Sequence, residues 1–201
     1  MKLINSEFGK FVPVRYNNRI YYGGFQESLK DRGVKKFYRD RSCVITAFTN
    51  TYLYMYRKNE NFTLDQYNDY QYWLYKIIRP KLWGVPTAEV LNLKLNRLRR
   101  AYPISLRSNI LTDSFIKRKT IDEKVDFITR AISRDLPVIF FNWLSPKVNI
   151  MTHHGVTITE IEKAGDEYML TISSWGKKYK ISLNKFSNQL RTYSGFIYFE
   201  K

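Results

Sequence analysis

One cysteine and two adjacent histidines are the residues of this chain that could perform nucleophilic chemistry. Cys43 is the single cysteine, and Ser42 directly before it is a typical N-cap residue. The sulfur is therefore expected in the first turn of a helix, where unpaired backbone N–H groups and the helix dipole stabilise a thiolate. The positive charges of Arg39 and Arg41, just before Cys43, would also stabilise the thiolate. The alternative is that Cys43 is a small buried hydrophobic residue, the commonest role of a lone cysteine.

The two histidines lie in an alternating segment, residues 152–158, which reads Thr-His-His-Gly-Val-Thr-Ile. A period of two places His154 on the same face as Val156, and His153 on the opposite face. If the Val156 face packs against the helix that carries Cys43, His154 lies beside the thiol and could act as its base. The alternative is that both histidines occupy the end of a strand without a chemical role.

A third segment, residues 170–176, reads Leu-Thr-Ile-Ser-Ser-Trp-Gly and follows the histidine strand by one hairpin. Taken alone, it fits either a catalytic motif or a hairpin whose tryptophan packs into the core beside the turn. A single cysteine rules out an intramolecular disulfide and a Cys-rich zinc site, and having only two histidines, adjacent in sequence, argues against a protein-only metal centre. The sequence therefore predicts no metal and no cofactor.

The order of these three segments resembles that of the papain superfamily of cysteine peptidases. A cysteine at a helix start comes first, then a strand that reads His-small-Val, and then a strand that ends in Ser-Trp-Gly. The third motif of that superfamily is Asn-Ser-Trp-Gly. The resemblance spans about residues 41–199, and the plan is most similar to that of the bacterial bacteriocin-leader peptidases. The long separation of Cys43 from His154 suits such a fold because the two residues meet in space. The resemblance implies a thiol hydrolase or acyl-transfer enzyme that acts on a peptide or amide bond.

The resemblance also implies a role for each matching residue. Cys43 would be the nucleophile and its backbone N–H one donor of the oxyanion hole. His154 would take the thiol proton and later return it to the leaving group. Ser173 stands where the family has the asparagine that orients the histidine. Trp175 would shield that hydrogen bond from water, Gly176 would permit the turn beside it, and Ser174 would be a supporting residue of the same motif.

Two departures from the family pattern concern polar side chains. The hydroxyl of Ser173 can accept a hydrogen bond from an imidazole, but it positions the ring less firmly than an amide does. The glutamine that supplies the second oxyanion donor has no counterpart in residues 37–42. Tyr38 or Arg39 could replace it there, and Asp40 could orient a histidine.

A third departure is Val44, which follows the nucleophile where the family usually has a small residue. Losing one oxyanion donor costs about 10²–10³ in rate. The alternative prediction is therefore a catalytically impaired papain-like fold that acts as a binding module for an acidic partner.

The helices and strands that position these residues are predicted from the spacing of apolar residues and from helix-capping residues in the sequence. Before residue 135 the pattern is mainly helical, with a hairpin at 12–22 and helices expected over residues 23–32, 43–58, 63–79, 86–101 and 120–131. After residue 137 short β-branched and aromatic runs predict strands at 138–143, 152–162, 168–173, 179–183 and 195–199. This order predicts an α+β class and one domain over residues 1–201, with a helical lobe at about 24–135 and an antiparallel sheet lobe at about 137–201.

Formal net charge is +16, which is typical of proteins that bind nucleic acids or acidic membranes. The basic residues are spread along the chain in short clusters, and no nucleic-acid-binding motif is present, so most of these charges are expected on solvated faces. Nucleic-acid binding is the weaker prediction. No apolar run approaches the roughly 20 residues of a membrane span, and residues 1–10 lack the apolar core of a secretory signal, which predicts a cytoplasmic protein.

Overall fold

The computed structural model describes residues 1–102, 104–143, 149–187 and 193–201, and shows a mixed α+β fold with two sheets, which confirms the predicted class. The helices are η1 (Gln26–Arg32), α1 (Lys36–Arg39), α2 (Cys43–Tyr56), α3 (Leu64–Ile78), α4 (Ala88–Ala101), α5 (Ile121–Ser133), η2 (Asn149–Met151) and α6 (Leu183–Ser187). The strands are β1 (Pro13–Tyr16), β2 (Arg19–Tyr22), β3 (Phe62–Thr63), β4 (Arg107–Ser114), β5 (Val138–Asn142), β6 (His154–Ala164), β7 (Glu167–Ser174), β8 (Lys177–Ser182) and β9 (Tyr193–Glu200). Within the described ranges, no helix has the length and apolar character needed to cross a membrane.

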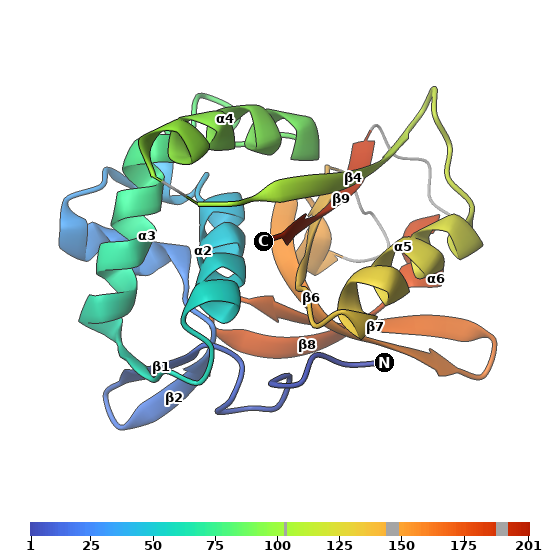
Figure 1. The fold of residues 1–201 in the computed structure, drawn as a ribbon, viewed down its shortest axis with the longest axis horizontal. Coiled ribbons are helices and arrows are strands. Elements are labelled where there is room, and N and C mark those ends of the chain that lie inside the picture. Colours follow the sequence, from blue (N-terminus) through green and yellow to red (C-terminus); the bar gives the residue numbers. More distant parts are fainter. Residues whose placement is uncertain (103, 144–148, 188–192) are drawn as a thin grey trace.

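A six-stranded antiparallel sheet forms the centre of the fold, in the order β4-β9-β5-β6-β7-β8 (Figure 1). A smaller sheet joins β1, β2 and β3. The strands predicted after residue 137 are present. The sequence does not predict β4, which lies in the segment expected to be helical and pairs with β9 along its whole length. Most of its side chains are half-buried, so β4 lacks the clear alternation that marks a strand with one buried face.

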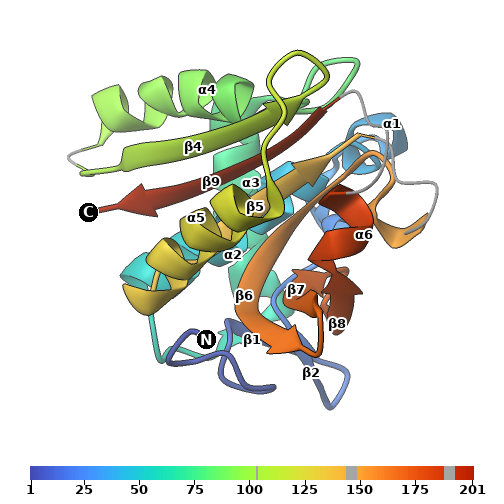
Figure 2. The same cartoon turned by 90° about the vertical axis from the view of Figure 1, so that its right-hand side faces the viewer.

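Helices pack on both faces of the sheet, with α2, α3 and α4 on one face and α5 on the other. On one face, Ile139 and Phe141 of β5 join a core cluster with residues of α2, α3 and α4. On the other face, Phe140 joins a cluster that includes Ile128 and Ala131 of α5. Figures 1 and 2 show α2 and α5 on opposite sides of β5 and β6. Both faces of β5 are therefore fully buried, as in the central layer of a three-layer arrangement.

The helix α2 begins at Cys43, as predicted, and is buried along nearly its whole length. Ser42 occupies the N-cap position, but its hydroxyl donates to the carbonyl of Tyr38 at 2.7 Å and does not cap the helix. Capping boxes begin two of the other helices, with Thr63 and Gln66 at the start of α3 and Thr120 and Glu123 at the start of α5.

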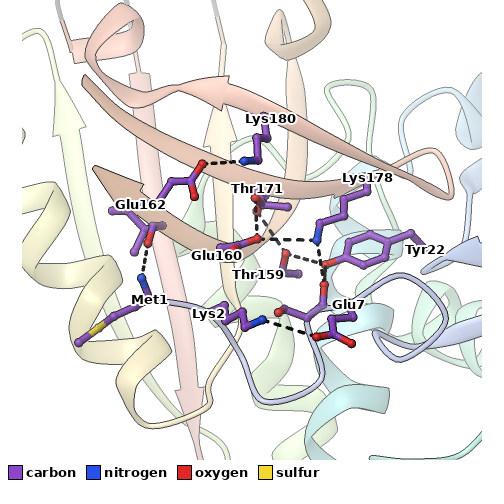
Figure 3. A network of polar contacts seen from close by, with 12 residues as sticks. Met1, Lys2, Glu7, Tyr22, Thr159, Glu160, Glu162, Thr171, Lys178 and Lys180 are labelled. Atoms are coloured by element: carbon purple, nitrogen blue, oxygen red, sulfur yellow. Dashed lines mark hydrogen bonds and ion pairs between the residues drawn. The ribbon is translucent and has the colours of Figure 1, made fainter. Parts of the chain in front are cut away.

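The N-terminal segment crosses the far end of β6 and ties it to the small sheet (Figure 3). The backbone N–H of Leu3 donates to the carbonyl of Thr159 at 3.0 Å, beside a shift in the pairing register of β6 and β7. The hydroxyl of Tyr22, at the end of β2, donates to Thr159 Oγ1 at 2.8 Å. The backbone N–H of Tyr22 also donates to the carbonyl of Gly176 at 2.8 Å. These contacts fix the end of β2 against the β7–β8 turn, and thereby fix the chain that leads into η1.

Candidate active site

Cys43 lies where the start of α2 meets the start of β6. Burial raises the pKa of the Cys43 thiol, and the neighbouring backbone N–H groups of Gly155 and Val44 lower it without cancelling the effect of burial. The thiol is therefore protonated in the resting protein, although the helix start supplies N–H donors for a thiolate.

The face of β6 that meets α2 is the one opposite to the predicted face. Thr157 Oγ1 donates to the carbonyl of Ala47 in α2 at 3.1 Å, and Gly155 lies against Val44. Val156 belongs instead to the core cluster on the α5 side. Both faces of β6 are buried, so the alternation of residues along the strand could not show which face packs against α2.

Close packing of α2 on β6 depends on the glycine beside the histidine. A Cβ atom at Gly155 would lie 2.5 Å from Cγ2 of Val44, a distance that no real carbon contact allows. Val44, the larger residue after Cys43, is thus accommodated by the glycine that follows His154. Cys43 and His154 line the same two cavities.

The imidazole of His154 is held on two sides. Its Nε2 lies 2.7 Å from Oγ of Ser174, and its ring stacks on Trp175 with a centroid separation of 4.4 Å and an interplanar angle of 19°. Burial lowers the pKa of His154 to about 4, so the ring is neutral at pH 7. Ser174 accepts from Nε2–H in the tautomer that leaves Nδ1 free to act as a base. No hydrogen bond joins the Cys43 sulfur to this ring in the described part of the chain.

Ser174, and not Ser173, is the partner of the histidine. Ser173 Oγ donates to the carbonyl of Tyr22 at 2.6 Å and accepts from Nδ2 of Asn50 at 3.4 Å. Successive residues of a strand point to opposite faces, so only one of the two serines can face His154. The hydrogen bond to the histidine that was predicted for Ser173 is made by Ser174, and Ser173 joins β7 to β2 and α2.

Replacing Ser174 by alanine is expected to slow acylation of Cys43 about tenfold, because one neutral hydrogen bond contributes about 0.5–1.5 kcal/mol. The measurement is the rate of release of p-nitrophenol from an activated peptide ester at pH 7. The matched control is Ser173→Ala, which should lower the melting temperature while keeping the acylation rate of the folded protein within about twofold. A larger rate loss for Ser173→Ala than for Ser174→Ala would reverse this assignment.

The basic segment before the nucleophile takes no part in the polar contacts of the histidine. Arg39 Nη1 donates to the carbonyl of Val34 at 3.2 Å, and Asp40 forms an ion pair with Lys36 at 2.6 Å. Tyr38 is exposed. Of the three residues considered as substitutes, Asp40 alone lines a cavity that Cys43 also lines, and its carboxylate is bonded away from the imidazole.

Gln26, the first residue of η1, is the site residue that sequence reasoning missed. It is 7% exposed and lines a small cavity that Cys43 and His154 also line. Within the described residues no hydrogen bond occupies its side-chain amide. The family pattern places this glutamine just before the cysteine, whereas Gln26 lies 17 residues before Cys43 and is brought to the site by the turn that precedes η1.

That turn is specified by Gly24, whose backbone N–H donates to Asn50 Oδ1 at 3.1 Å. A Cβ atom at Gly24 would lie 2.0 Å from the Tyr67 ring, so no other residue fits without displacing the ring. The Gly23-Gly24 pair ahead of Gln26 was thus the available signal for a close backbone approach.

Two cavities meet at the cysteine and the histidine. The small cavity lies on one side of Cys43 and His154, and several of its lining residues carry polar side chains. Its other lining residues are Gly24, Gln26, Thr46, Ala47, Asn50, Gly155, Ser173, Ser174 and Trp175. A cleft of about 430 Å³ opens on the other side, lined by Asp40, Arg41, Val44, Leu82, Trp83, Gly84, Val85, Pro86, Phe141, Asn142, Trp143 and His153. His153 is exposed at the rim of this cleft and does not line the small cavity. An extended substrate could therefore pass over Cys43 with polar groups on one side and a large apolar wall on the other.

Among the described residues, no group of three or more His, Cys, Asp or Glu side chains is placed to hold a metal ion.

No protein-family model matches the chain, and neither a curated protein nor a solved structure was found to be similar to it.

Proposed function

We propose that this protein is a thiol hydrolase or acyl-transfer enzyme of papain-like design that acts on a peptide or amide bond through a thioester at Cys43. The observation that carries the proposal is the setting of His154. Its ring is fixed by Ser174 and Trp175, its Nδ1 makes no hydrogen bond within the described residues, and it lines the same two cavities as a cysteine at a helix start.

In the proposed reaction, Sγ of Cys43 attacks the substrate carbonyl carbon while Nδ1 of His154 takes the thiol proton. Because burial disfavours both charged forms, proton transfer accompanies the attack and does not precede it. The C–N bond then breaks, and Nδ1 returns the proton to the leaving amine. Water, or an acceptor amine in an acyl-transfer reaction, finally attacks the thioester and frees the thiol.

The negative charge on the carbonyl oxygen needs donors that are in place before the reaction. The backbone N–H of Cys43 at the helix start is one, and the side-chain amide of Gln26 is the second. Trp175 covers the contact between His154 and Ser174, which keeps water from competing for the imidazole.

The test is covalent acylation of Cys43. Mixing the protein with an activated p-nitrophenyl ester of a short peptide should release p-nitrophenol in a burst, and mass spectrometry should place the acyl group on Cys43. Cys43→Ala should abolish both signals. If the wild-type protein reacts no faster than free cysteine at the same pH, the fold is catalytically silent, and the alternative is a binding module whose net charge of +16 attracts an acidic partner.

A further inference from the structure

The wall of the 430 Å³ cleft consists mainly of large apolar side chains. Trp83 is 81% exposed and Leu82 is 60% exposed, although both are residues that normally contribute to a core. Trp143 stands at the rim and is 37% exposed. A cleft of this volume falls within the range of sites that enclose a small ligand or a large side chain.

The exposed wall is held in place by its backbone. Residues 81–84 form a tight turn in which Lys81 and Gly84 exchange backbone hydrogen bonds at 3.2 and 2.9 Å. Arg41, two residues before the nucleophile, donates from Nε to the carbonyl of Leu82 at 2.7 Å. Trp143 Nε1 donates to the carbonyl of Pro86 at 2.6 Å. The segment that carries Trp83 is therefore tied both to the start of α2 and to the end of β5.

Gly84 makes this attachment possible. Its φ of +69° lies in the left-handed region that favours glycine, and a Cβ atom there would lie 2.9 Å from the carbonyl oxygen of Arg41. The indole of Trp83 is thus presented to the cleft by a specified turn, and it is positioned before any substrate arrives. Such preorganisation reduces the entropy that binding must overcome.

We propose that the cleft binds a large apolar or aromatic side chain of the substrate, packed against Trp83 and Trp143, and that Cys43 therefore prefers peptide or amide substrates that carry such a side chain next to the scissile bond. This inference rests on the proposed function. The occupant is assigned to the substrate because Cys43 and His154 themselves line the cleft, so a chain that reaches the thiol must pass along this wall.

The test compares three activated amides that differ only in the side chain next to the scissile bond, namely phenylalanine, glycine and aspartate. The phenylalanine substrate should have the highest kcat/KM. Trp83→Ala should reduce its advantage over glycine about tenfold, which corresponds to about 1.4 kcal/mol. Phe115→Ala is the matched control, because Phe115 is 69% exposed and does not line the cleft. This control should leave the preference unchanged.

Binding measured without turnover separates this inference from the proposed function. A fluorescent phenylalanine peptide should bind Cys43→Ala, and Trp83→Ala in that background should weaken the binding about tenfold. Binding without any turnover by the wild-type protein would overturn the proposed function and retain the cleft assignment. Turnover with equal kcat/KM for phenylalanine and glycine, or with a preference for aspartate, would overturn the cleft assignment and retain the function.

Discussion

Replacing His154 by alanine is expected to slow the acylation of Cys43 by about 10²–10⁴-fold, which is the usual contribution of a positioned general base. The thiol of Cys43 has a raised pKa and is protonated in the resting protein, so it depends on a neighbouring base to lose its proton during the attack. The measurement is the second-order rate of acylation by an activated peptide ester at pH 7, with folding checked by circular dichroism.

His153→Ala is the matched control for this substitution. His153 is the adjacent residue of the same type, it is exposed, and its backbone N–H donates to the carbonyl of Trp143 whichever side chain it carries. Its removal should change the acylation rate by less than about threefold. Equal losses for the two variants would mean that neither imidazole acts as the base and that the catalytic proposal is wrong.

The same prediction has a pH dependence with a defined sign. His154 acts in its neutral form, and burial lowers its pKa to about 4 from the ordinary value of 6.5. The His154-dependent part of the rate should therefore persist as the pH falls through 6.5 and should be lost near pH 4. A loss centred near pH 6.5 would show that the imidazole is hydrated in the working protein.

Local features of the site could be predicted from the sequence because short-range rules determine them. The start of α2 at Cys43, the strand of His154 and both capping boxes follow from side-chain type and periodicity. The α+β class follows from the change of period near residue 137. The position of α5 on the opposite face of the sheet and the half-buried strand β4 at its edge do not follow from that change of period.

Features that depend on one element meeting another could not be predicted in this way. A strand that is buried on both faces gives no indication of which face meets α2, so the packing of Gly155 on Val44 appears only in three dimensions. The choice between Ser173 and Ser174 depends on the register of β7 against β6, which a one-residue shift reverses. Gln26 approaches Cys43 through a turn specified by contacts with α2 and α3.

Replacing Gln26 by alanine is expected to lower kcat by about 10²–10³-fold with little change in KM, which is the effect of removing one oxyanion donor. The side-chain amide meets the substrate oxygen only when negative charge develops there, so its loss weakens the transition state more than the bound substrate. Gln26→Glu should be at least as slow, because a carboxylate replaces the N–H donor with an acceptor.

The matched control is Gln71→Ala, which also removes a buried glutamine amide close to α2. Gln71 Nε2 donates to Thr46 Oγ1 at 2.6 Å, and its loss leaves a buried hydroxyl with one partner fewer. That variant should lose about 1–3 kcal/mol of stability while the folded protein keeps its kcat. Gln26→Ala should show the opposite pattern, because its amide makes no hydrogen bond within the described residues. A rise in KM at unchanged kcat for Gln26→Ala would instead assign Gln26 to substrate binding, and Cys43 would then stabilise the oxyanion through its backbone N–H alone.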